Sequence, residues 1–201
     1  MNRTRAAAIT VTAVALAGVL AACGSGDDAG TAAPPSSTAS AMPSMSGAMS
    51  GDHNESDATF ASDMIVHHRG AIEMAKLASS RAADPTVVTL AKRIEAAQQP
   101  EITTMSAWLR SWGMEMPSEM AGMHDSMPGM MSPADMDKLT AARGPEFDDM
   151  FLTMMIEHHE GALTMAQTEV SAGSNPEAKS LAQKVIQDQT AEIAEMRKML
   201  G

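Results

Sequence analysis

The sequence contains very few aromatic residues: tyrosine is absent, and 201 residues include only three Phe and two Trp. Strands are normally enriched in aromatic and β-branched side chains, so this composition argues against a core built on a sheet. Ala and Met are abundant instead, and they favour helices packed through small and flexible side chains. The composition therefore predicts an all-α protein with one modest domain.

Positive charge and cysteine are also scarce. The net charge is −11, and the first 22 residues contain two Arg but no acid, which leaves −13 on the remainder. Nucleic acid is not expected as a partner, because binding phosphates needs concentrated positive charge. The single Cys23 allows no intramolecular disulfide. The sequence also has no CxxC motif, no phosphate-cradling Gly loop and no Ser/His/Asp arrangement for nucleophilic catalysis.

The first 22 residues are typical of a bacterial export signal. Residues 2–5 form a short basic start, residues 6–22 are apolar, and the segment ends in Leu20-Ala21-Ala22-Cys23-Gly24. This ending resembles a lipobox, which implies that Cys23 is lipidated and anchors the mature chain to a membrane. An ordinary signal peptide or an uncleaved anchor is the alternative. In each case we expect the folded part outside the cytoplasm, on the outer face of the cytoplasmic membrane or in the periplasm.

Residues 23–56 consist mainly of Gly, Ser, Ala, Thr and Pro and have almost nothing to bury, which predicts a disordered tether. The tether nevertheless carries three Met and one His spaced three to four residues apart. This spacing suits an arm that catches metal, and drift in low-complexity sequence explains it equally well. The residues concerned are Met42, Met45, Met49 and His53.

The main feature of the chain is a duplicated segment. FASDMIVHHRGAIEMA, residues 60–75, recurs 91 positions later as FLTMMIEHHEGALTMA, residues 151–166. On a helical wheel, both His residues of each copy border the apolar stripe, so we expect them to face the interior. Asp84-Pro85 and Asn175-Pro176 each provide an N-cap followed by Pro at the first helical position, which predicts a second helix in each copy.

We therefore predict helices at about residues 57–81, 85–111, 145–172 and 176–200, and a further short helix beginning at Pro133. Neither hairpin, repeat 1 at about 57–112 or repeat 2 at about 145–200, can bury its apolar face alone. The two hairpins are expected to pack into a four-helix bundle over residues 57–201, with a long Met-rich crossover at 113–144.

Met and His pairs indicate a metal site inside this bundle. Met64 and His68 lie one above the other on one helix face, as do Met155 and His159. Adjacent His side chains on a helix diverge by about 100°, so we expect the two in each copy to have different neighbours. Core filling is the stronger alternative for Met74, Met105, Met165 and Met196. The candidate metal ligands are Met64, His67, His68, Met74, Met105, Met155, His158, His159, Met165 and Met196.

The ligand types favour copper. Thioether sulfur is soft and suits Cu(I), while imidazole can hold either oxidation state, so Cu(I) is favoured and Cu(II) is compatible. A ferritin-type diiron centre needs Glu-x-x-His motifs, and the sequence has none. The crossover is also rich in Met, which is typical of accessory Cu(I) capture, with a hydrophobic lid as the alternative. The accessory candidates are Met114, Met116, Met120, Met123, His124, Met127, Met130 and Met131.

The paired F-x-x-x-M-I-x-H-H-x-G-A-x-x-M-A motifs resemble those of the domain-of-unknown-function 305 (DUF305) family over roughly residues 57–200. The resemblance implies a ferritin-like bundle and a secreted copper-binding protein. It also implies functional roles for the Met and His residues of the motif. Asp63 in the first copy stands where the second copy has Met154, which leaves equal affinity of the two halves open. The implied positions are Met64, His67, His68 and Met74, and Met155, His158, His159 and Met165.

The leading hypothesis is a membrane-tethered copper-binding protein, not an enzyme, that sequesters Cu(I) or hands it to another copper protein and so contributes to copper homeostasis or tolerance. One alternative is a ferritin-like metal oxidase, which the scarcity of inward carboxylates disfavours. Another is a structural envelope lipoprotein without metal, in which Met only fills the core. Metal would raise the melting temperature under the first hypothesis and leave it unchanged under the last.

Overall fold

The computed structural model describes residues 52–118 and 127–201, and Cys23, Met42, Met45, Met49, Met120, Met123 and His124 lie outside these ranges. The described residues form five helices and no strand, which confirms the all-α prediction. No helix among them is long and apolar enough to span a membrane. The helices are α1 (Glu55–Arg81), α2 (Pro85–Ser111), α3 (Pro133–Ala141), α4 (Pro145–Ala172) and α5 (Pro176–Leu200).

Side-chain caps set where the helices begin. Helix α1 begins two residues before the expected residue 57, because Asn54 and Asp57 form a capping box around its first turn. Helices α2 and α5 begin at the expected Pro residues, where Asp84 and Asn175 accept hydrogen bonds from the first backbone N–H groups. The short helix α3 begins at Pro133 after the N-cap Ser132.

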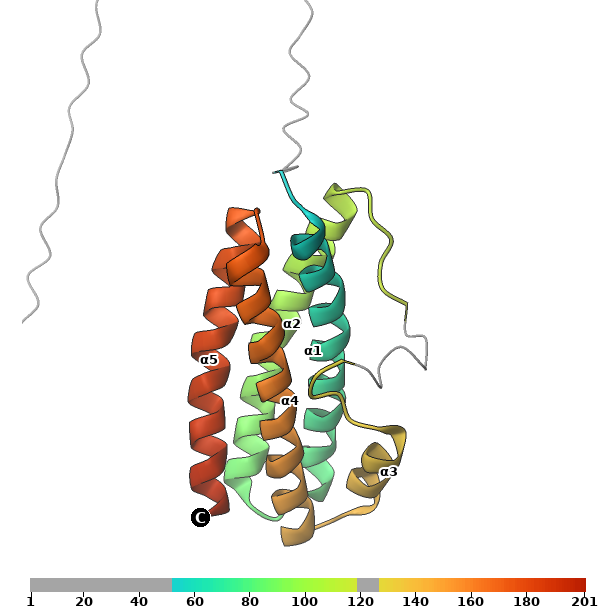
Figure 1. The fold of residues 1–201 in the computed structure, drawn as a ribbon. Coiled ribbons are helices and arrows are strands. Elements are labelled where there is room, and N and C mark those ends of the chain that lie inside the picture. Colours follow the sequence, from blue (N-terminus) through green and yellow to red (C-terminus); the bar gives the residue numbers. More distant parts are fainter. Residues whose placement is uncertain (1–51, 119–126) are drawn as a thin grey trace, which may run out of the picture. The chain divides into compact units, whose positions relative to one another are not determined.

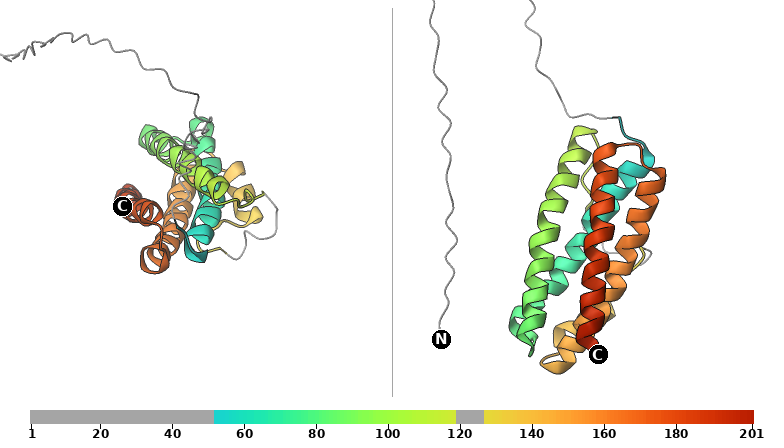
Figure 2. Two further views of the ribbon diagram at one scale, coloured as in Figure 1. Left: turned by 90° about the horizontal axis from the view of Figure 1, so that it is seen from above. Right: turned by 90° about the vertical axis from the view of Figure 1, so that its left-hand side faces the viewer.

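The four long helices form a bundle of two antiparallel hairpins (Figure 1). Helix α1 packs on α2 and α4 packs on α5, and the hairpins meet mainly through α1 and α4. Helix α3 contacts α1 and α4 on the side away from α5 (Figure 2). The predicted bundle of two helical hairpins is therefore present.

Two buried aspartates connect the hairpins. Asp57 in α1 accepts hydrogen bonds from the backbone N–H groups of Ser174 and Asn175, at 3.1 and 2.9 Å. Asp148 in α4 accepts them from the backbone N–H groups of Ala83 and Asp84, at 3.2 and 2.9 Å. The two aspartates lie 91 positions apart. Each repeat therefore caps the second helix of the other repeat, because these N–H groups have no partner within their own helix.

Candidate metal centre

All four motif histidines are buried between α1 and α4, with exposed fractions of 0 to 1%. The prediction that neighbouring histidines have different partners is confirmed. His68 and His159 each meet a carboxylate from the second helix of their own hairpin. The other two, His67 and His158, stack on each other between α1 and α4.

The two histidine–carboxylate pairs have the same geometry. His68 Nε2 lies 2.8 Å from Glu101 Oε2, and His159 Nε2 lies 2.8 Å from Glu192 Oε2. A carboxylate accepts a hydrogen bond, so in a neutral ring the proton is on Nε2 and the lone pair is on Nδ1. Both Nδ1 atoms are buried and have no hydrogen-bond partner among the described residues. Each ring therefore presents a lone pair to the interior, which is the arrangement that a metal-binding imidazole needs.

The carboxylate of Glu101 has a second basic neighbour. Lys184 Nζ lies 3.1 Å from Glu101 Oε1. Burial raises the pKa of Glu101, but the hydrogen bonds from His68 and Lys184 and the positive charge of Lys184 outweigh it and leave the pKa below its ordinary value. Glu101 is therefore ionised near neutral pH and can accept both hydrogen bonds.

His67 of α1 and His158 of α4 form the central histidine pair of the motif, with ring centroids 3.7 Å apart and planes inclined by 24°. Burial and the neighbouring His158 hold the pKa of His67 well below its ordinary value, and burial lowers the pKa of His158 to about 3. Both rings are therefore neutral at physiological pH. His158 Nε2 lies 2.9 Å from the carbonyl oxygen of His67, and Nδ1 lies 2.9 Å from that of Gly129; because a neutral ring has only one N–H, it donates to one of these two oxygens.

The crossover loop lies directly against these two rings. His158 Nδ1 is 2.9 Å from the carbonyl oxygen of Gly129, and His67 Nε2 is 3.2 Å from that of Pro128. The close approach requires Gly161 in α4, because a Cβ atom there would lie 2.0 Å from the oxygen of Pro128. Gly129 itself has a φ of +75°, which favours glycine. The loop therefore closes one side of the histidine pair.

The predicted thioether ligands fall into two groups. Met64 and Met105 belong to one buried cluster, and Met155 and Met196 belong to a second. All four are 0% exposed. Met74, which comes from the first copy, lies in the cluster of the second copy.

Met165 shows the reverse relation. It comes from the second copy, is only half-buried and packs against the cluster that contains Met64 and Met105. Each hairpin therefore contributes sulfur to both halves of the bundle, which the sequence spacing did not indicate.

Besides the histidine nitrogens, two buried side-chain amide oxygens have no hydrogen-bond partner among the described residues. They are the Oε1 atoms of Gln98 and Gln189, which lie 91 positions apart. Within the same ranges, no three His, Cys, Asp or Glu side chains are grouped so that they could hold a metal ion. A centre built from the described side chains therefore needs thioether sulfur or amide oxygen besides imidazole.

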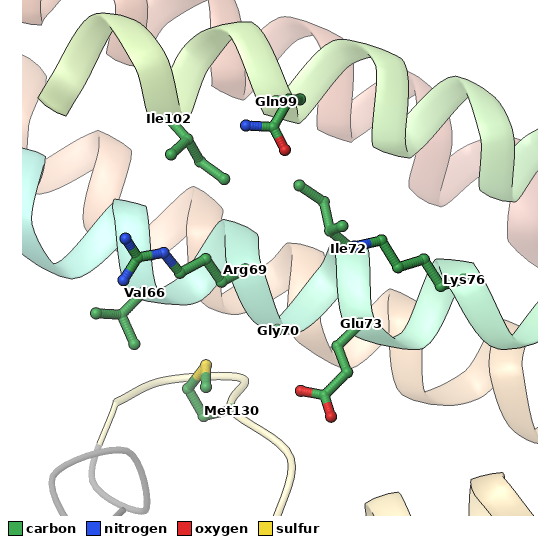
Figure 3. A pocket seen from close by; sticks show the side chains of 9 residues that line it. All are labelled: Val66, Arg69, Gly70, Ile72, Glu73, Lys76, Gln99, Ile102 and Met130. Carbon is green, nitrogen blue, oxygen red and sulfur yellow. The ribbon is translucent and has the colours of Figure 1, made fainter. Parts of the chain in front are cut away.

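The described methionines of the crossover are only partly available to a ligand. Met114 is exposed, Met127 is half-buried, and Met116 and Met131 pack against the two core clusters. Met130 lines a pocket of about 610 Å³ between α1 and α2, where Figure 3 shows its side chain facing α1 beside Gly70. A Cβ atom on Gly70 would lie 3.4 Å from His158 Cε1 and 3.5 Å from Met130 Cε, so Met130 lies close to the central histidine pair.

The comparisons with known proteins agree with the motif. The model of a domain of unknown function, DUF305, matches residues 57–200. The chain belongs to the DUF305 family. The resemblance found in the sequence is thereby confirmed. None of the curated proteins matches the chain.

Solved structures of two DUF305 proteins and of CopM share this fold. One from Streptomyces coelicolor, described as a candidate secreted protein, is 35% identical with a TM-score of 0.67, covering 72% of this chain and 91% of that one. A DUF305 fragment from Deinococcus radiodurans is 29% identical with a TM-score of 0.69, covering 75% and 99%. CopM in its Cu(II)-bound form is 33% identical with a TM-score of 0.64, covering 72% and 95%.

Sequence reasoning missed several residues that shape the site in this DUF305 chain. It did not identify Glu101 and Glu192 as the partners of His68 and His159. The signal was present, because the two pairs have the same separation of 33 residues. The contact of the loop with Gly161 was also missed, because nothing in the loop sequence indicates which helix the loop contacts.

Proposed function

We propose that this chain is an extracytoplasmic, membrane-tethered protein that binds Cu(I) inside its helical bundle and sequesters it or transfers it to another protein. Two sites, one in each half of the bundle and called half-sites below, would each bind one copper ion. The first uses His68 Nδ1 with Met64 and Met105, and the second uses His159 Nδ1 with Met155 and Met196. Copper here is the cargo of the protein, and no chemical turnover is proposed.

The observation that carries this proposal is the pair of buried imidazoles whose Nε2 atoms face a carboxylate and whose Nδ1 atoms have no partner among the described residues. A buried polar atom without a partner costs about 1–3 kcal/mol. The unpaired atom occurs twice, at positions 91 apart, and the methionine one helical turn before each histidine, Met64 or Met155, belongs to a buried core cluster. Imidazole nitrogen with thioether sulfur is a donor set suited to Cu(I).

The relatives support the choice of metal. CopM, which shares the fold and about one third of its residues with this chain, has been solved in Cu(II)-bound, Cu(I)-bound and silver-bound forms. Silver(I) is a soft monovalent ion like Cu(I), so a site that takes both is expected to contain soft donors. The candidate secreted protein of the same family supports a location outside the cytoplasm.

The central histidines and the crossover have accessory roles in this proposal. His67 and His158 would hold the loop against the bundle. The Nδ1 atom of His67, which has no hydrogen-bond partner among the described residues, would offer one more nitrogen donor to a metal ion. The exposed and half-buried methionines of the loop would capture Cu(I) and pass it inward, with Met130 closest to the histidine pair. Lipidation of Cys23 would tether the bundle to the membrane, and Cys23→Ser is then expected to release the protein in soluble form.

The test is to load the purified mature protein anaerobically with Cu(I) and to count bound metal against a competing chelator. His68→Gln and His159→Gln keep a hydrogen-bonding amide beside each glutamate but remove the imidazole donor. Each variant is expected to lose one interior copper, and the double variant is expected to lose both. His53→Ala, which alters an exposed ring stacked on Trp112, is the control and is expected to keep the interior sites.

Bound copper must also raise the melting temperature, because a ligand that binds only the folded state stabilises it by about 2.7 kcal/mol at 100 times its Kd. Wild-type protein that retains no copper, or a double variant that binds as much as wild type, would contradict the proposal. Steady oxygen uptake on adding Cu(I) or Fe(II) would favour a metal oxidase instead.

A further inference from the structure

The two halves of the proposed centre differ in the charge that surrounds their carboxylates. Glu101 accepts a hydrogen bond at each oxygen, from His68 at 2.8 Å and from Lys184 at 3.1 Å. Glu192 has one hydrogen-bond partner among the described residues, His159, and the charge of Arg93 acts on it without a hydrogen bond. The two histidine–carboxylate pairs therefore match in geometry, but only the carboxylate of the first pair is hydrogen-bonded to a cation.

The origin of this difference lies in one pair of equivalent cations. Lys184 of α5 and Arg93 of α2 stand 91 positions apart, and each faces the second helix of the other hairpin. Lys184 reaches Glu101, whereas Arg93 forms its hydrogen bond with Glu195 and not with Glu192. The position equivalent to Glu195 is Thr104, which carries no charge that could compete for Lys184.

A second contact orients Lys184. Its Nζ atom also pairs with Asp188, four residues later on α5, and the equivalent position in α2 is Ala97. Asp188 shares the charge of the ammonium group, but the two contacts together hold Nζ beside Glu101. The side chain of Lys184 is 55% exposed while that of Glu101 is 11% exposed, so the ammonium reaches from solvent to a largely buried carboxylate.

From this asymmetry, which rests on the copper-binding function proposed above, we infer that Lys184 is a positioning residue that makes the His68 half-site weaker for a soft monovalent cation than the His159 half-site. The hydrogen bond from the ammonium withdraws negative charge from Glu101. Glu101 then polarises the Nε2–H of His68 less, and His68 Nδ1 becomes a poorer electron donor. The ammonium charge also repels a bound cation.

The expected difference is moderate because Lys184 is partly solvated. Direct partners of metal ligands change affinity by about 10-fold to 100-fold, whereas a half-exposed charge one residue further out is expected to contribute about threefold to tenfold. Unequal half-sites would fill in order, with the His159 half-site first.

The test uses silver(I) as the probe and measures the affinity of each half-site separately in the full mature chain. The His159→Gln background leaves the first half-site, and the His68→Gln background leaves the second. Lys184→Met is expected to tighten silver binding at the first half-site by about threefold to tenfold. Lys184→Arg keeps the positive charge and is expected to restore the wild-type affinity.

Two further variants separate this effect from a general change in charge. Glu195→Thr frees Arg93 to pair with Glu192 and is expected to weaken the second half-site by a similar factor, about threefold to tenfold. Lys198→Met removes one exposed positive charge from the same helix and is expected to change neither half-site. The ¹⁵N shift of His68 Nε2 reports the polarisation directly and is expected to move with Lys184→Met but not with Lys198→Met.

Two results would overturn the inference: an unchanged ratio of the two affinities in Lys184→Met, or Lys184→Arg behaving like Lys184→Met. In both cases silver still binds, so the proposed function stands. If neither single-site background binds silver, the proposed function itself fails.

Discussion

Gly161→Ala tests whether the crossover loop lies directly on α4 and supports the histidine pair. The added Cβ atom would lie 2.0 Å from the carbonyl oxygen of Pro128, 2.4 Å from its carbonyl carbon and 2.8 Å from the Cα atom of Gly129. All three are backbone atoms, so no rotamer change can relieve the contacts. The loop must move off the helix and separate from His67 and His158.

The magnitude follows from the hydrogen bonds that the movement breaks. The Pro128 carbonyl accepts from His67 at 3.2 Å, and the Gly129 carbonyl accepts from His158 at 2.9 Å in the tautomer with the proton on Nδ1. Each bond to a buried group contributes about 1–2 kcal/mol. Alanine is better than glycine within a helix by about 1 kcal/mol, which offsets part of this loss. We therefore expect Gly161→Ala to lower the free energy of unfolding by about 1–3 kcal/mol.

Gly70 is the matched control, because it is the equivalent glycine of the first copy. A Cβ atom there would meet His158 and Met130 at 3.4 and 3.5 Å, which are ordinary contacts. Gly70→Ala is therefore expected to stabilise the protein by about 0.5–1 kcal/mol through helix propensity alone. Urea denaturation of both apo variants is the assay. Equal stabilities for the two variants would refute the loop contact as described.

Two further predictions concern the carboxylates at the ends of the bundle. Burial and the neighbouring Asp57 raise the pKa of Glu169 from 4.5 to about 7, so the folded state holds a proton that the unfolded state releases. The stability contributed by this proton is present below pH 4.5 and is lost as pH rises through about 7. Glu169→Gln is therefore expected to be more stable than wild type at pH 8 and to show a flatter profile between pH 5 and 8 in thermal melts; the same slope as wild type would contradict this. Asp148→Ala removes the acceptor for two backbone N–H groups at the start of α2 and is expected to cost about 2–4 kcal/mol in urea denaturation. Exposed Asp149→Ala is its control, and equal values for the two would show that the cap contributes nothing.

Much of the fold could be predicted from the sequence because its signals are local. Apolar periodicity, the caps at Asp84 and Asn175 and the prolines that follow them mark α2 and α5 to the residue. The duplicated motif also indicated correctly that the histidines face the interior. Each of these signals depends on neighbours along the chain, and helix geometry converts such spacing directly into faces and ends.

Partner choice between elements was decided only by the tertiary structure. Spacing places His68 and Glu101 on inward faces, but the packing of α1 against α2 sets the 2.8 Å between them. The crossover has no apolar periodicity, so the sequence does not show which helix it contacts. The loop backbone packs on α4 at Gly161 because that position has no side chain. Likewise, equivalent positions predict equivalent roles for Lys184 and Arg93, yet competition from Glu195 separates them. A helical repeat fixes directions within one element, while contacts between elements depend on helix packing and on which charges lie within reach.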